Sequence, residues 1–140
     1  METLVRALIP MVSFGFDSFL AGLAIGFCAL SWRERFRLAV TFGVCDAAAT
    51  LLGSWWPHSF QGPLVLAVYL LCVLLLVPSA PTRRALFYAL PVLLSVDNLF
   101  GGAPASAATA LGAVSTAMAL LGLNLAALGR RMFFMREAEI

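Results

Sequence analysis

Long apolar runs separated by short polar connections dominate the pattern of the chain. A helix rises ~1.5 Å per residue, so about 20 apolar residues are needed to cross about 30 Å of hydrocarbon. Five runs reach or approach this length, and they cover residues 5–30, 38–56, 61–79, 85–102 and 105–129. The pattern therefore predicts an all-α, polytopic membrane protein with about five transmembrane helices.

The connections at residues 31–37, 57–63, 78–84 and 101–106 carry glycine, proline and charged residues, which end helices. All the basic residues are arginines, and every one except Arg6 lies in the first connection, in the third, or after the last run. Because basic loops stay on the inner side of a membrane, this distribution predicts an outside N-terminus and a cytoplasmic C-terminus. We expect a multi-pass protein of the bacterial inner (plasma) membrane.

Composition agrees with this class of protein. The 140 residues are 62% hydrophobic and 11% charged, and their mean hydropathy is +0.98, which lies outside the usual range of a soluble domain. We expect a single membrane domain over residues 1–140, with the lipid bilayer as a partner and the arginines at phospholipid headgroups. The net charge of +2 is too small to indicate nucleic-acid binding.

Two short sequence matches indicate an internal repeat. Residues 42–53 line up with residues 111–122, which pairs Asp46 with Ser115, and residues 17–22 line up with residues 97–102. We expect one repeat over about residues 5–79 and a second, truncated repeat over about residues 85–131.

A repeat of three helices contains an odd number of crossings, so its second copy would enter the membrane from the opposite face. Such an inverted repeat is common in transporters, which place their site near the midplane between the halves. The second repeat lacks a third helix. A second copy of the chain in a homodimer, or another membrane subunit, would supply it.

Three aspartates, Asp17, Asp46 and Asp97, each lie well inside a different apolar run. An ionised carboxylate at the bilayer centre opposes insertion by roughly 2.5–3.5 kcal/mol, and such acids usually serve ions or protons. Three of them indicate a cation site, which should take up at least one proton when its cation leaves.

Small and polar residues recur at helical spacing beside these acids. They form three predicted faces, namely Gly15, Ser18, Gly22 and Gly26; Gly43, Asp46, Thr50 and Gly53; and Gly112, Ser115, Ala119 and Gly122. Residues at such spacing share one side of a helix, and small side chains let transmembrane helices approach closely. The polar groups on these faces should therefore point into helix interfaces instead of into lipid.

Oxygen donors accompany the acids, with Ser18 near Asp17 and Ser95 near Asp97. Hard cations such as Mn²⁺, Mg²⁺ and Ca²⁺ prefer oxygen ligands, whereas zinc and copper favour imidazole and thiolate groups. No histidine lies inside any of the runs. The expected metal-binding residues are Asp17, Asp46, Asp97, Asn98, Ser115 and Thr116.

Pro91 lies inside the fourth run, six residues before Asp97. A proline removes a backbone donor and kinks or breaks a helix. A break here would free carbonyl groups for an ion. A tolerated kink without such a role is the alternative.

The run Met11-Val-Ser-Phe-Gly-Phe-Asp-Ser-Phe-Leu-Ala-Gly22, together with residues 37–53 and Leu94-Ser-Val-Asp-Asn98, resembles the bacterial manganese efflux pumps of the wider lysine exporter superfamily. The resemblance implies two inverted three-helix repeats and the ion-binding acids Asp17, Asp46 and Asp97. This chain differs from that family in two features. The family usually has glutamate where this chain has Asp46, and it has six spans where this chain has five predicted runs.

We therefore expect a transporter, not an enzyme, that exports a divalent cation in exchange for protons and has no resident cofactor. Manganese is the leading candidate. Two alternatives stay open, namely export of another cation or small cationic solute, and a non-transporting structural or accessory subunit of a larger membrane complex.

Overall fold

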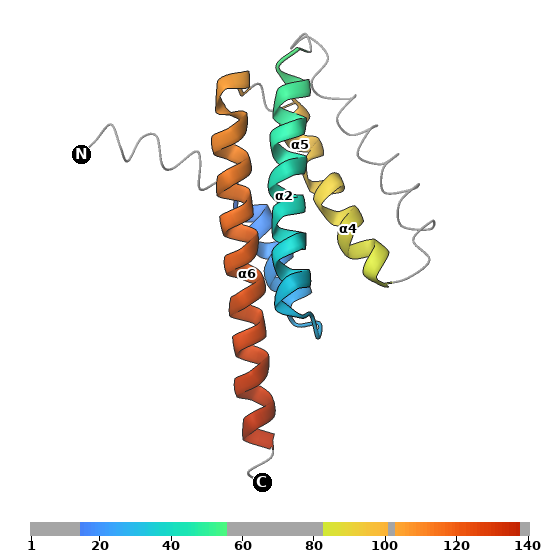
Figure 1. Ribbon diagram of the computed structural model, residues 1–140, viewed down its shortest axis with the longest axis vertical. Coiled ribbons are helices and arrows are strands. Elements are labelled where there is room, and N and C mark those ends of the chain that lie inside the picture. The colour runs from blue at the N-terminus through green and yellow to red at the C-terminus, as the bar shows by residue number, and fades with distance from the viewer. Residues whose placement is uncertain (1–14, 56–82, 101–102, 138–140) are drawn as a thin grey trace, which may run out of the picture.

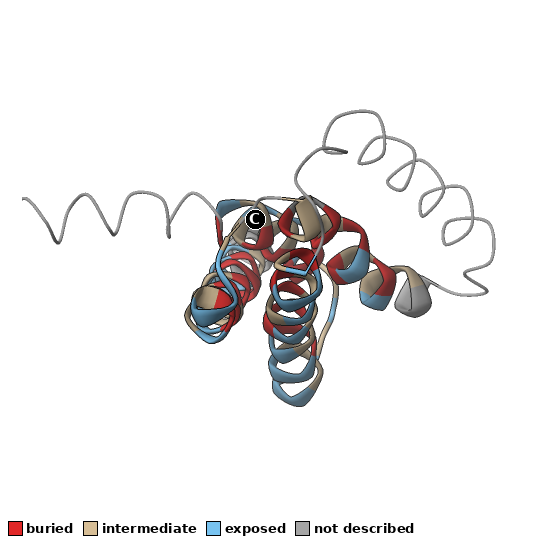
Figure 2. Cartoon of the chain, turned by 90° about the horizontal axis from the view of Figure 1, so that it is seen from above, coloured by how far each residue is buried: buried red, intermediate tan, exposed pale blue. Residues whose placement is uncertain are grey.

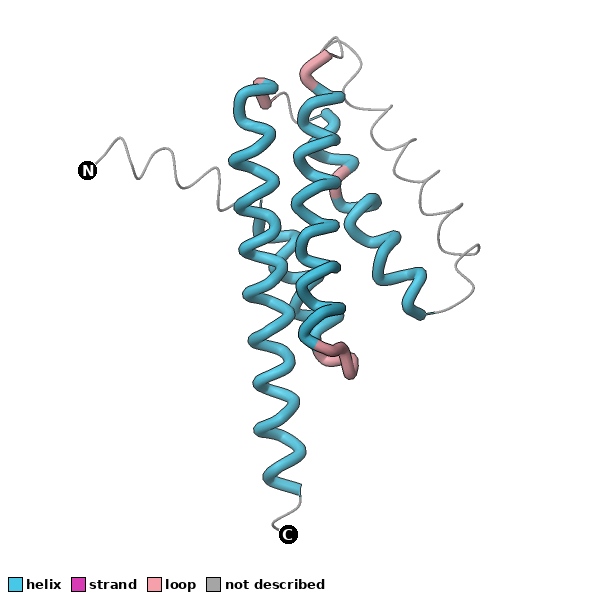
Figure 3. The backbone as a smooth tube through the Cα atoms, viewed as in Figure 1, coloured by secondary structure: helices cyan, strands magenta, loops and turns pink. Residues whose placement is uncertain are grey.

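The computed structural model describes residues 15–55, 83–100 and 103–137, and every regular element in this part of the chain is a helix (Figure 3). The elements are an N-terminal helix at Gly15–Gly26, then α2 (Trp32–Gly53), α4 (Arg83–Leu94), α5 (Val96–Phe100), the short 3-10 helix η2 (Ala105–Ala107) and α6 (Ala108–Glu137). The prediction of an all-α protein is confirmed for these residues.

The helices α2 and α6 lie side by side and run in opposite directions (Figure 1). The N-terminal helix packs against α6 through glycines, while α4 and α5 pack against α2. Buried residues line the faces that these helices turn toward one another (Figure 2). The core cluster consists of Ile25, Leu38, Ala39, Phe42, Ala119 and Leu123.

The start of α2 corrects the predicted boundary of the first connection. Ser31 Oγ accepts a hydrogen bond from the amide of Glu34, and the Glu34 carboxylate accepts one from the Ser31 amide at 2.8 Å. This reciprocal capping box begins the helix at Trp32, so residues 32–37, which we predicted as a loop, form its first turns. The carboxylate and the serine in Ser31-Trp-Arg-Glu34 satisfy backbone donors that would otherwise lack partners.

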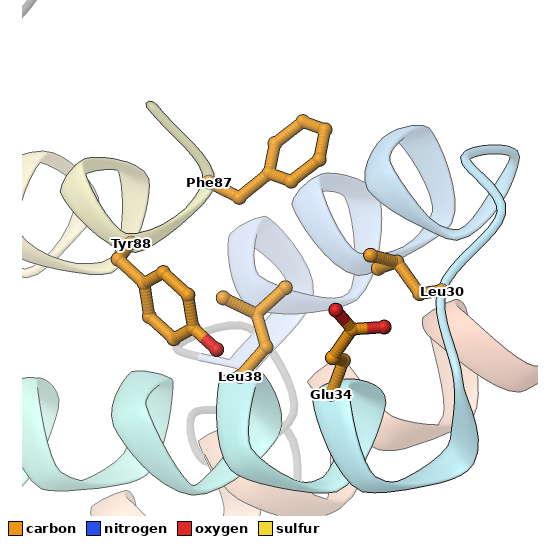
Figure 4. Close-up of a pocket in the computed structure, with 5 residues that line it drawn as sticks. All are labelled: Leu30, Glu34, Leu38, Phe87 and Tyr88. Atoms are coloured by element: carbon orange, nitrogen blue, oxygen red, sulfur yellow. The ribbon is translucent and has the colours of Figure 1, made fainter. Parts of the chain in front are cut away.

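A small cavity of about 20 Å³ separates the start of α2 from α4. Its lining residues are Leu30, Glu34, Leu38, Phe87 and Tyr88 (Figure 4). The Glu34 side chain that caps α2 therefore lies on the side of this helix that faces α4.

Two of the described helices are long and apolar enough to cross a membrane, Trp32–Gly53 and Ala105–Met132. The apolar helices Gly15–Gly26 and Leu86–Phe100 are shorter, and the predicted span over residues 61–79 lies outside the described residues. The structure thus contains two candidate membrane spans, and the larger number of five remains a prediction.

The fourth predicted run is interrupted one turn after Pro91. The helix α4 ends at Leu94, Ser95 forms a turn, and α5 begins at Val96. The carbonyl oxygen of Pro91 accepts from the Ser95 amide at 3.0 Å and also lies 2.6 Å from Ser95 Oγ. The regular helix is thus interrupted after Pro91, and a role for freed carbonyl groups in ion binding stays a prediction.

Glycine contacts between α2 and α6 follow the internal sequence match. A Cβ added at Gly43 would collide with Thr116 Oγ1, and one added at Gly112 would lie 2.9 Å from the Cβ of Ala47. The sequence match pairs Gly43 with Gly112 and Ala47 with Thr116. The same contact therefore occurs twice, once from each helix.

A second pair of contacts obeys the same rule. A Cβ at Gly53 would collide with the carbonyl oxygen of Leu99 on α5, and one at Gly122 would collide with the carbonyl oxygen of Phe19 on the N-terminal helix. The sequence match pairs Gly53 with Gly122 and Phe19 with Leu99. Equivalent positions in the two halves thus make equivalent backbone contacts.

We predict that Gly53→Ala and Gly122→Ala destabilise the protein to a similar extent, by about 1–3 kcal/mol each, because the new methyl group must displace a backbone carbonyl. Thermal unfolding of the purified protein in detergent measures the loss. Gly129→Ala is the matched control, since a Cβ there has nothing within 4 Å and alanine favours helix. A neutral result at both contact positions would contradict the packing.

Candidate functional site

The three predicted small-residue faces are buried, as expected, at all of their positions. The polar members are among the least exposed groups of the molecule, with Ser18 at 0%, Ser115 at 1% and Asp46 at 2% relative exposure. The spacing of glycine and polar residues therefore identified the helix interfaces correctly. The polar groups meet where the N-terminal helix, α2, α6 and the α4–α5 break converge.

The carboxyl group of Asp46 on α2 lies at the centre of this convergence. Ser95 Oγ, in the turn between α4 and α5, lies 2.5 Å from Asp46 Oδ1. Ser115 on α6 donates to Oδ2, and Ser18 Oγ on the N-terminal helix lies 3.4 Å from the same oxygen. Ser18 and Ser115 also contact each other, at 2.6 Å between their hydroxyl oxygens.

The described hydrogen-bond partners of Asp46 are polar but uncharged. Among the described residues, each partner of its carboxyl group is a serine hydroxyl. An ionised carboxylate with uncharged partners in a buried site is unfavourable unless a cation or a proton neutralises it. The oxygen atoms gathered here are of the kind that could hold a cation.

Ser95 Oγ lies between two oxygen atoms that can accept its proton. A hydroxyl carries a single proton, yet Ser95 Oγ has two oxygen neighbours at close range, Asp46 Oδ1 at 2.5 Å and the Pro91 carbonyl at 2.6 Å. The carboxyl group of Asp46 and the carbonyl group of Pro91 therefore compete for the same serine proton.

The three predicted acids differ in their positions in the structure. Asp46 occupies the centre just described, whereas Asp17 is half-buried and its Oδ1 accepts from the Ser18 amide at 2.6 Å. The side chain of Asp97, on α5, lies outside the described residues. Within the part of the chain that is described, no group of three histidine, cysteine or acidic residues comes together. The pairing of Asp17 with Asp97 thus stays a prediction.

The predicted secondary ligands also separate into groups. Ser115 contacts Asp46 directly, and Asn98 is buried on α5 at 4% exposure, one helical turn from Ser95. Thr116 instead donates to the carbonyl of Gly112 within its own helix at 2.9 Å. Its hydroxyl faces the close approach at Gly43.

The hydroxyl groups of Ser18 and Ser95 contact Asp46, an acid that sequence proximity does not indicate. Ser18 also contacts its neighbour Asp17, through its backbone amide, while the pairing of Ser95 with Asp97 stays a prediction. Neighbours on a helix point about 100° apart, so a serine next to an aspartate in sequence usually faces another direction. The face shared by Ser18 with the glycines was the signal that placed it at the interface.

No protein-family model, curated protein or solved structure matches the chain.

We predict that Ser115→Ala destabilises the protein by about 1–3 kcal/mol, because a buried carboxyl oxygen loses its donor. Combining it with Asp46→Asn should give a loss smaller than the sum of the two single losses, since the two side chains act on one contact. Thermal unfolding of the four proteins measures the coupling. Thr41→Ala is the control, because the hydrogen bond that its hydroxyl makes among the described residues is to the Arg37 carbonyl in its own helix. Strict additivity of Ser115→Ala and Asp46→Asn would contradict the contact.

Proposed function

We propose that the protein is a membrane transporter that exports a divalent cation, with manganese the leading candidate, in exchange for protons. The observation that carries this proposal is the buried Asp46 carboxyl group with hydroxyl oxygens from the N-terminal helix, the α4–α5 turn and α6 around it. In this proposal a metal ion and protons bind the site in turn.

The exterior of the helices supports a location in the membrane. In the most apolar segments of the two long helices, only 39% and 44% of the residues are buried. Many of the residues that are not buried carry large apolar side chains, for example Val44 at 61% and Leu52 at 56% exposure. Lipid would cover such a surface more favourably than water does.

The arrangement of the ends supports the proposed orientation in the inner membrane. The start of α2, the start of α4 and the end of α6 lie at the same end of the bundle (Figure 1). The arginine-rich segments 33–37, 83–84 and 130–136 belong to these three helix ends. A common basic end favours a cytoplasmic side there.

The repeated glycine contacts support a transporter of the inverted-repeat type, whose site lies between the halves. In this proposal the chain crosses the membrane five times, and a second copy or another subunit supplies the sixth helix. Asp17, Asp97 and Asn98 would add oxygen ligands to those of Asp46 and Ser115 as the ion passes. Oxygen ligands favour a hard ion such as Mn²⁺, Mg²⁺ or Ca²⁺.

A non-transporting membrane subunit is the second candidate function. It is favoured by the serine hydroxyl groups, which can stabilise a purely structural Asp46 by hydrogen bonds. Export of another cation or small cationic solute is the alternative within the transport class.

We predict that the protein, reconstituted in liposomes with a manganese-sensitive dye, moves Mn²⁺ in response to a pH gradient. Asp46→Asn should slow this transport by at least about tenfold, since a loss of only ~1.4 kcal/mol in ion binding lowers affinity tenfold. Asp17→Asn and Asp97→Asn should both lose Mn²⁺ transport. Thr41→Ala, which also removes a polar group from α2, should transport normally.

Each other outcome has a defined meaning. Normal transport by a folded Asp46→Asn protein would remove the observation on which the proposal rests. Transport of Mg²⁺ or Ca²⁺ in preference to Mn²⁺ would change the ion but keep the mechanism. A wild-type protein that moves no cation and purifies with a stoichiometric membrane partner would establish the accessory role.

A further inference from the structure

A second polar site lies between the start of α2 and the second half of α6, away from Asp46. A cavity of about 160 Å³ opens there, lined by Arg35, Asn124, Ala127, Leu128 and Arg131. Its volume far exceeds the ~10–15 Å³ that a single water needs. Of the described residues that line it, two are arginines and none is acidic.

Arg35 is held in a fixed orientation at this cavity. Its Nη1 donates to Asn124 Oδ1 at 2.7 Å, and its guanidinium lies 5.6 Å from the centre of the Trp32 ring. Asn124 is itself anchored, because its Nδ2 donates to the carbonyl of Leu120 at 2.9 Å. Such a fixed guanidinium is suited to bidentate recognition of a phosphate or carboxylate.

One donor of this group is buried without an acceptor. Among the described residues, Arg35 Nε finds no hydrogen-bond partner, which is costly for a group that belongs to a cation. The nearest acid in sequence, Glu34, caps α2 and lines the separate cavity toward α4 (Figure 4). An anionic group from outside the described chain would satisfy the donor.

The walls of the cavity indicate where this anion comes from. Leu128 lines the cavity and is 56% exposed, and Leu121 and Leu125, on the same side of α6, are 49% and 45% exposed. The cationic cavity therefore continues into an apolar surface. A phosphate group joined to acyl chains matches both parts, whereas a free phosphate matches only the first.

We propose that this cavity binds the phosphate group of an anionic phospholipid, with Arg35 and Arg131 as its cationic partners. Basic pockets between transmembrane helices at the cytoplasmic side are typical of such binding. The bound lipid ties the start of α2 to the end of α6. This inference does not depend on the transported ion.

The test is thermal unfolding of the purified full-length protein in neutral detergent, with phosphatidylglycerol added. Phosphatidylglycerol should raise the unfolding temperature by mass action, whereas diacylglycerol with the same acyl chains, which lacks the phosphate, should not. Arg131→Gln should lose most of the shift. Arg33→Gln removes the same charge at the same end of the bundle, but Arg33 is exposed and does not line the cavity. This control variant should keep the shift.

Three results would overturn the proposal. Equal losses in Arg131→Gln and Arg33→Gln would reduce the effect to general attraction between basic residues and anionic lipid. A full shift in Arg131→Gln would place the lipid elsewhere. A shift with soluble glycerol phosphate as large as that with phosphatidylglycerol would assign the cavity to a free phosphate.

Discussion

The close approach of α2 and α6 is the contact on which the remaining arrangement depends. In a membrane, two apolar helices would gain little from association, because the acyl chains are as apolar as their side chains. Direct backbone contact at Gly43 and Gly112 supplies dispersion attraction that larger residues would prevent. This contact brings Asp46 of α2 within reach of Ser115 of α6, and both side chains are buried.

Burial of Asp46 then requires partners from the other helices. One hydroxyl comes from the N-terminal helix and one from the turn between α4 and α5, so the polar contacts join parts of the chain that are distant in sequence. A site of this kind links the position of four helical segments to the charge of one side chain. The same residues therefore serve stability and, in the proposed function, ion exchange.

The sequence was most informative where periodicity and small size coincide. The spacing of Ser18 with Gly15 and Gly22 predicted a buried face, and the prediction holds because helix geometry alone decides which side chains align. The predicted start of α2 is wrong, because the capping pair of Ser31 and Glu34 starts the helix inside the arginine-rich segment that predicts a loop. Which acid a serine contacts could not be predicted, because that depends on how whole helices pack.

The symmetric role expected for Asp17 and Asp97 also depends on how whole helices pack. A sequence match can establish that two positions are equivalent, but their separation depends on the crossing of helices that lie far apart in the chain. Asp46 became central because its helix contacts the N-terminal helix, α5 and α6 alike. These contacts belong to the tertiary structure, and the local sequence pattern does not predict them.

Ser95 connects the buried carboxyl group to the break in the backbone. Its single hydroxyl proton can satisfy either Asp46 or the carbonyl of Pro91, and that carbonyl belongs to the last turn of α4 before the helix breaks. A movement of the turn between α4 and α5 would therefore change the hydrogen bonding of Asp46.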